Sequence, residues 1–178
     1  MIRLFAALPV PFDIAETLAR RQQGLPGARW SPAENLHITL RFFGEVEETR
    51  AADLDAALAA IVVPSFEIAL KGAGCFGDAQ RMRAVWAGVA ENAELARLAA
   101  KCETAAKRSG LKPETRAFRP HVTLAYLKHT PEARAAAWVQ GHNLLQSPPW
   151  RARGFNLYSS WRSEEGSRYD LERHYPLG

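Results

Sequence analysis

The sequence predicts an α+β fold that arose by internal duplication, and three observations lead to this prediction. The stretch His37-Ile38-Thr39-Leu40 recurs 84 residues further on as His121-Val122-Thr123-Leu124 (position 37 against position 121). Similar strand and helix patterns flank the two stretches in the same order. The 178 residues contain only seven threonines and nineteen leucines, yet two of the five histidines are followed by x-Thr-Leu.

The elements expected in the first half follow from hydrophobic periodicity and from the positions of Gly and Pro. In chain order we expect a strand at 2–8 ended by Pro9, a helix at 11–23, a loop at 27–32, the first histidine strand at 36–43 closed by Gly44, a helix at 47–61, a strand at 66–71 and a Gly-rich loop at 72–77.

The second half repeats this order. We expect a strand at 84–87, a helix at 91–109 stopped by Gly110, a basic loop at 112–119, the second histidine strand after Pro120, a helix at 131–140, and strands at 151–159 and 168–175. No Gly/Ser/Pro-rich linker separates the halves. We therefore expect one bilobal domain over 1–178, with approximate halves 1–80 and 81–178. Each pseudo-symmetric lobe is expected to be a mainly antiparallel sheet with helices packed outside, and the active cleft is expected between the lobes.

Alternation along a strand places each histidine and its threonine on one face. Ile38 and Leu40, like their counterparts in the second copy, then point into the core. Histidine carries protons near neutral pH, and a hydroxyl can donate to an anion. Two such pairs facing each other would suit acid–base chemistry around an oxyanion such as phosphate. For a single copy, a histidine that is merely hydrogen-bonded on a strand remains the alternative.

Composition sets further limits. Hydrophobic residues make up 47% and charged residues 24%, as is usual for a globular protein. The chain has no apolar run of membrane-spanning length and no signal-peptide pattern at its start. Its two cysteines, Cys75 and Cys102, are too few for a disulfide framework. We expect a monomer in the cytoplasm, without a membrane association.

The net charge is +4, with 18 Arg against 5 Lys. Arginine suits phosphate, although a GC-rich coding sequence would give the same bias. His129, His142 and His174 are expected to have surface or capping roles. No H-x-H, H-D or carboxylate cluster accompanies the histidines, which argues against a metal centre, and we expect no metal or other cofactor. The 72–77 segment lacks the Lys-Ser/Thr of a phosphate-binding loop.

The chain resembles the RNA 2′,3′-cyclic phosphodiesterases, also called 2′-5′ RNA ligases, of the two-histidine phosphoesterase superfamily. The residues that carry the resemblance are Asn35-Leu36-His37-Ile38-Thr39-Leu40 with Phe43-Gly44-Glu45, Arg116-Ala117-Phe118-Arg119-Pro120-His121-Val122-Thr123-Leu124, and Gly154-Phe155-Asn156-Leu157-Tyr158-Ser159. Together with the N-terminal strand they span nearly the whole chain.

The resemblance implies hydrolysis of an RNA terminal 2′,3′-cyclic phosphate to a 2′-phosphate without metal, with RNA or a related nucleotide as partner and with reversible 2′-5′ ligation as an added activity. It implies that His37 donates a proton, that His121 accepts one, and that Thr39 and Thr123 hold the phosphate oxygens. A basic residue often lies two places beyond the second Leu in this family, whereas this chain has Tyr126 there.

Further substrate contacts are expected from Arg41, Phe42, Arg119, Tyr126 and Tyr158. Arg41 is expected to continue the face of His37 and Thr39, with a solvated arginine at the strand end as the alternative. Trp30 and Phe76 are further candidates for base stacking, with core packing as the alternative for each aromatic residue. Two other functions stay open: an enzyme for a small cyclic phosphate such as ADP-ribose cyclic phosphate, and a non-catalytic binder of nucleotides or RNA ends.

Overall fold

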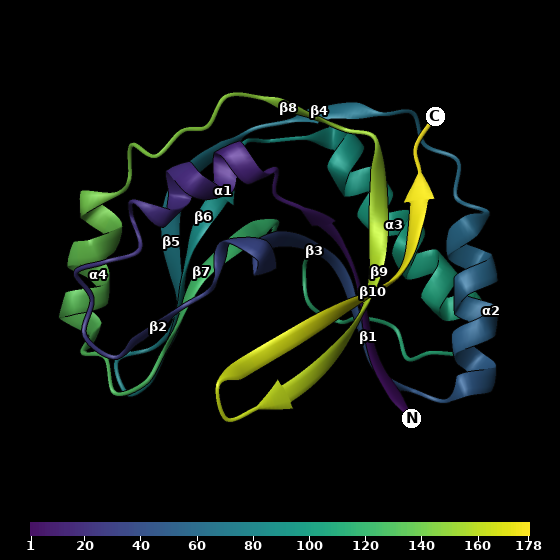
Figure 1. Cartoon of the computed structure of the whole chain (residues 1–178), viewed down its shortest axis with the longest axis horizontal. Helices are drawn as coiled ribbons and strands as arrows, with labels where there is room; N and C mark the ends of the chain where they lie inside the picture. The colour runs from purple at the N-terminus through teal and green to yellow at the C-terminus, as the bar shows by residue number, and fades with distance from the viewer.

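The computed structural model describes residues 1–178 and consists of a large twisted sheet with four α-helices around it (Figure 1). The strands are β1 (Ile2–Pro9), β2 (Ala28–Trp30), β3 (His37–Val46), β4 (Phe66–Ile68), β5 (Leu70–Gly77), β6 (Met82–Val89), β7 (His121–Leu127), β8 (Trp150–Ala152), β9 (Gly154–Ser163) and β10 (Gly166–Pro176). The helices are α1 (Phe12–Ala19), α2 (Glu48–Ala59), α3 (Ala93–Arg108) and α4 (Glu132–Gly141), with a 3-10 turn η1 (Ala33–Asn35).

The main sheet has the strand order β10-β9-β1-β3-β7-β6-β5, with β2 added beside β7. Its neighbouring strands are antiparallel, and β4 and β8 form a separate two-stranded ribbon. The two histidine strands meet at the centre, where Ile38 pairs with Val122. The prediction of a bilobal, mainly antiparallel α+β fold is confirmed, because the sheet consists of two parts that join at β3 and β7.

The helices cover the two parts of the sheet separately. α2 and α3 contact each other, and α3 also lies against β3, whereas α4 lies against β5 and β6. Figure 1 shows α1 and α4 on one side of the molecule and α2 and α3 on the other. α3 begins at a polar cap, since the Asn92 side chain accepts a hydrogen bond from the Leu95 backbone N–H at 3.0 Å.

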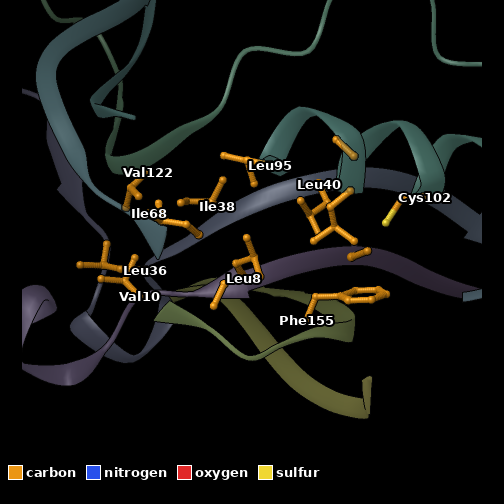
Figure 2. Packing of buried hydrophobic residues seen from close by; sticks show 14 of the residues in the cluster. Leu8, Val10, Leu36, Ile38, Leu40, Ile68, Leu95, Cys102, Val122 and Phe155 are labelled. Carbon is orange, nitrogen blue, oxygen red and sulfur yellow. The ribbon is translucent and has the colours of Figure 1, made fainter. Parts of the chain in front are cut away.

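Strands from both halves of the chain build each part of the sheet. β9 and β10, near the C-terminus, extend the part that contains β1, while β5 from the first half of the chain forms the far edge beyond β6. The lobes of the sheet therefore do not coincide with the sequence segments 1–80 and 81–178. One connected cluster of buried residues includes Leu8, Ile38, Val122 and Phe155, so both parts share a single core (Figure 2).

Several expected boundaries were wrong. The helix predicted over 11–23 ends at Ala19. Beyond its end, the Gln22 side-chain amide donates to the carbonyls of Ser31 and Leu124 at 2.8 and 3.0 Å, which ties this segment to β7. The loop predicted over 27–32 contains β2, which pairs with β7. The strand expected at 66–71 is divided between β4 and β5. The strand expected at 151–159 is likewise divided between β8 and β9.

Glycine gave misleading signals at two positions. Gly44 does not close β3, because the strand continues to Val46 through a bulge with Gly44 at φ 75°. The expected Gly-rich loop at 72–77 is part of β5. Gly74 there lies beneath the indole of Trp86, where an added Cβ would come within 2.3 Å of the ring. Small size, rather than a turn, explains this glycine. No helix in the structure is both long and apolar enough to cross a membrane.

Candidate active site

The junction of β3 and β7 brings the two repeated motifs together. Because the strands are antiparallel and Ile38 pairs with Val122, the register directs His37 towards Thr123 and Thr39 towards His121. Ile38 and Val122 are fully buried on the core side, while the two histidines and two threonines are partly exposed on the other side. All four residues predicted from the sequence therefore share one face of the sheet.

Both imidazoles are held in the same way. His37 Nδ1 lies 2.6 Å from the carbonyl oxygen of Asn35, and His121 Nδ1 lies 2.6 Å from the carbonyl oxygen of Arg119. A carbonyl oxygen only accepts, so Nδ1 carries the proton in both rings. Each neutral ring consequently has its free lone pair on Nε2, and each protonated ring can donate from Nε2. Either histidine can thus act as acid or base through the same atom.

Aromatic side chains from neighbouring strands enclose each imidazole. The ring centroid of His37 lies 5.1 Å from that of Phe5 on β1 and 5.4 Å from that of Tyr169 on β10. His121 has Phe76 of β5 at 4.8 Å and Trp86 of β6 at 5.8 Å. These contacts restrict the orientation of both rings.

The surroundings of the histidines also change their acidity. Burial lowers the pKa of His37 below 6.5, against the opposing effect of the hydrogen bond to Asn35, and the nearby charge of His121 lowers it further. Burial likewise lowers the pKa of His121, with the hydrogen bond to Arg119 opposing it. The free protein therefore favours neutral imidazoles at pH 7, and a bound anion would offset this effect.

A β-bulge follows the motif in both histidine strands. Ala6 and Ala7 on β1 pair with Arg41 and Thr39, so Leu40 is an extra residue in β3. Val85 and Trp86 on β6 pair in the same way with Ala125 and Thr123 of β7, with Leu124 extra. Each bulge shifts the alternation of side chains by one residue. Phe42 and Tyr126 are thereby placed on the exposed face, at equivalent positions of the two motifs.

The predicted placement of Arg41 is wrong for the same reason. The bulge turns Arg41 to the opposite face, where it is only 8% exposed. Its guanidinium pairs with Glu103 of α3, and it donates to the carbonyls of Phe42 and, at 2.6 Å, Lys112. Glu103 in turn accepts a hydrogen bond from the Glu114 backbone N–H at 3.0 Å. This network joins β3 and α3 to the 112–119 loop and leaves Arg41 no role at the open face.

A pocket of about 560 Å³ opens beside His37. It lies between the open face of β3, the end of β7 and the β9–β10 hairpin, and the sequence-predicted residues among its lining are His37, Thr39, Phe42, Tyr126 and Trp30. Two contacts hold the hairpin across the pocket. Arg29 donates to the Glu164 carbonyl at 2.8 Å, and the Asn35 side chain donates to the Ser167 carbonyl at 3.1 Å.

The other predicted residues lie outside this pocket. Arg119 serves His121 through its backbone carbonyl, and its exposed side chain does not line the pocket. Tyr158 stacks on Phe5 with centroids 5.3 Å apart, and its hydroxyl accepts a hydrogen bond from the Asn156 amide at 2.8 Å. Tyr158 thus supports Phe5 instead of lining the pocket.

Sequence reasoning missed Tyr169, Arg3 and Arg162, all of which line the pocket. Tyr169 and Arg162 belong to the β9–β10 hairpin, far from either motif in the sequence. Arg3 lies on β1, for which the sequence analysis predicts a strand but no site residue. No group of three or more His, Cys, Asp or Glu side chains is arranged to hold a metal ion, and both cysteines are free.

Two Nδ1-protonated imidazoles, each with a strand-borne threonine, on adjacent strands of a duplicated sheet define a phosphoesterase of the two-histidine type. The profile of the 2′-5′ RNA ligase superfamily matches residues 10–164. The chain belongs to this superfamily.

Individual relatives are similar over most or part of the chain. The RNA 2′,3′-cyclic phosphodiesterase of Archaeoglobus fulgidus is 32% identical over 172 residues, which cover 94% of this chain and 96% of the relative. That of Aeropyrum pernix is 47% identical over 96 residues, so that the match spans 53% of this chain and about half (54%) of the relative. The crystal structure of Escherichia coli LigT complexed with 3′-AMP superposes with a TM-score of 0.79 at 28% identity, covering 99% of this chain and 98% of LigT.

Proposed function

We propose that this chain hydrolyses the terminal 2′,3′-cyclic phosphate of RNA to a 2′-phosphate, and that it also catalyses reversible 2′-5′ ligation of RNA ends. The observation that carries the proposal is the matched pair of imidazoles on β3 and β7, each presenting Nε2 to the same face. The superfamily assignment and the cyclic phosphodiesterase activity for which the relatives are named support it.

In the proposed reaction, water attacks phosphorus and passes a proton to Nε2 of neutral His121. The bond between phosphorus and the 3′ oxygen breaks, and Nε2–H of protonated His37 gives its proton to the departing oxygen. The hydroxyls of Thr39 and Thr123 donate to the phosphate oxygens, whose negative charge increases in the transition state. In ligation, a terminal 5′-hydroxyl replaces water as the nucleophile: its oxygen bonds to the phosphorus of the same 2′,3′-cyclic phosphate, its proton passes to His121, and the bond to the 3′ oxygen breaks to leave a 2′-5′ linkage.

The pocket beside His37 supports the assignment of roles. The departing 3′ oxygen belongs to the nucleoside that carries the cyclic phosphate, so this nucleoside must lie on the side of the acid. His37, Phe42 and Tyr126 line the pocket, and the exposed fractions of Phe42 and Tyr126 are 37% and 52%. Their rings can stack on a base. The attacking water then approaches from the side of His121, where the exposed Arg119 lies.

One observation favours a second candidate, hydrolysis of a small cyclic phosphate such as ADP-ribose cyclic phosphate. The pocket volume of about 560 Å³ is within the usual range for small-molecule sites. We also propose that the chain acts as a single bilobal domain and as a monomer in the cytoplasm, without a membrane association and without a metal or other cofactor.

The test is incubation of the purified protein with RNA ending in a 2′,3′-cyclic phosphate, in the presence of EDTA, with the position of the product phosphate mapped. We expect only 2′-phosphate. Activity that is lost in EDTA and restored by Zn²⁺, Mn²⁺ or Mg²⁺ contradicts the mechanism. Ligand binding without turnover would instead identify a non-catalytic binder of RNA ends.

A further inference from the structure

The pocket contains more positive charge than one phosphate requires. Besides His37 it is lined by the guanidinium groups of Arg3, Arg29 and Arg162, against a single carboxylate, Glu165. None of the three arginines has a carboxylate oxygen within 4.0 Å of its side-chain nitrogen atoms. The four ion pairs of the molecule all involve other arginines. Arg29 donates only to the Glu164 carbonyl.

Arg3 lies against an aromatic ring of the pocket. Its guanidinium carbon lies 5.0 Å from the ring centroid of Phe42, so the aromatic face fixes the guanidinium in the pocket. Phe42 occupies this place because of the bulge at Leu40. A guanidinium that packs on an aromatic ring and lacks a carboxylate partner is preorganised to bind an oxyanion through bidentate hydrogen bonds.

The position of Arg3 relative to His37 is also defined. Tyr169 lies edge-on to His37 at 5.4 Å, and Phe5 fills the space between β1 and the imidazole. Along β1, Arg3 and Phe5 both line the pocket, and they pair with Glu45 and Phe42 of β3, whereas His37 pairs with Pro9. Arg3 therefore lies farther along the strand from His37 than Phe5 does.

We infer that the substrate carries a second phosphate, attached to the 5′ oxygen of the nucleoside with the cyclic phosphate, and that Arg3 binds it. This inference rests on the proposed function. The 5′ carbon of ribose projects away from the 2′,3′ edge, so a nucleoside whose 2′,3′ edge faces His37 directs its 5′ phosphate deeper into the pocket. The phosphodiester of an RNA chain and the diphosphate of ADP-ribose cyclic phosphate both supply such a group, whereas a nucleoside cyclic phosphate does not.

The experiment compares adenosine 2′,3′-cyclic phosphate with the same compound bearing a 5′-phosphate. We expect kcat/KM of the wild-type protein to be about 10- to 100-fold higher for the 5′-phosphorylated compound, the usual effect of a charge-assisted hydrogen-bond pair. Arg3→Gln should reduce this ratio to about one, and Arg3→Lys should keep part of it. The matched control is Arg168→Gln on β10, an exposed arginine that is paired with Asp170 and does not line the pocket. This variant should keep the wild-type ratio.

A wild-type ratio near one, or an unchanged ratio in Arg3→Gln, overturns the inference while leaving the proposed function intact. The dissociation constants of adenosine 2′-phosphate and adenosine 2′,5′-bisphosphate, measured by calorimetry in the same variants, give the comparison without turnover. If no cyclic phosphate is hydrolysed, the proposed function fails, and the dissociation constants alone decide on the second phosphate. Where cyclic phosphates are hydrolysed, two substrates distinguish the source of the second phosphate: a dinucleotide that ends in a 2′,3′-cyclic phosphate, and ADP-ribose cyclic phosphate. The physiological substrate should show the larger loss of kcat/KM in Arg3→Gln.

Discussion

Replacement of Arg41 by Met separates the structural role observed for this residue from the substrate-binding role expected from the sequence. The substitution keeps an unbranched apolar stem but leaves Glu103 without its ion-pair partner and the carbonyls of Phe42 and Lys112 without a donor. The side chains of Arg41 and Glu103 are only 9% and 21% exposed. Removing one partner of a buried ion pair costs about 3–5 kcal/mol, and the partial exposure of Glu103 favours the lower end, about 3 kcal/mol.

Urea unfolding followed by fluorescence of the five tryptophans measures this loss. With an m-value of about 2 kcal/mol/M, a loss of about 3 kcal/mol lowers the midpoint by about 1.5 M. Glu103→Gln keeps an acceptor and should cost about 1–2 kcal/mol, and the double variant should show a coupling energy of about 2 kcal/mol. Because Arg41 does not line the pocket, kcat/KM of the folded variant should stay within about tenfold of wild type.

The pH dependence provides an internal check. Burial raises the pKa of Glu103, but hydrogen bonds from Arg41 and the Glu114 backbone outweigh it and leave the pKa below 4.5. A carboxyl whose pKa is lower in the folded state stabilises the fold above its unfolded pKa and loses this contribution as the pH falls through the folded value. The difference between wild type and Arg41→Met should therefore shrink below about pH 4. A destabilisation under about 0.5 kcal/mol together with a hundredfold loss of kcat/KM would refute the structural role.

Three further predictions concern the catalytic face. Since burial lowers the pKa of both histidines below 6.5, the pH profile of kcat/KM should be bell-shaped with its optimum below pH 6.5. The optimum of kcat should lie at higher pH, because bound phosphate favours imidazolium; a steady rise of the rate to high pH would contradict this prediction. Thr39→Val and Thr123→Val should each slow turnover by about ten- to a thousand-fold, with Thr104→Val on α3 as the control, and wild-type rates in both would show that the hydroxyls only occupy strand positions. With a nitrophenyl phosphodiester, whose leaving group needs no proton, His37→Ala should recover much of its lost rate and His121→Ala should not; recovery by His121→Ala alone would mean that the roles are reversed.

The catalytic face was predictable because it depends on local alternation. From His37 to Thr39, and again from His121 to Thr123, the strands are regular, and the sequence pattern was sufficient to place both side chains. The prediction failed one residue after Leu40. The bulge there arises from the pairing of β3 with β1, and nothing in the residues around Arg41 indicates it. A buried arginine is also rare enough that sequence reasoning favours an exposed one.

The rest of the pocket depends on contacts between distant segments. Tyr169 reaches His37 only because β10 pairs with β9, and β9 with β1. The extent of the pocket likewise depends on where the hairpin meets β2 and η1. The sequence pointed to Tyr126 as a site residue only because a basic residue is common at this position in the family that the chain resembles. Its equivalence with Phe42 became evident once the two bulges were aligned.

The unequal access of the two imidazoles imposes an order on the catalytic cycle. Under the proposed mechanism each turnover ends with His37 deprotonated and His121 protonated, the reverse of the starting state. His37 lies inside the pocket between Phe5 and Tyr169, where the product nucleoside still covers it, whereas His121 lies outside this pocket. Solvent can therefore remove the proton from His121 at once but can recharge His37 only after the product has left. Dissociation of the product and recovery of the acid become one event, which added buffer cannot accelerate but lower solvent viscosity can.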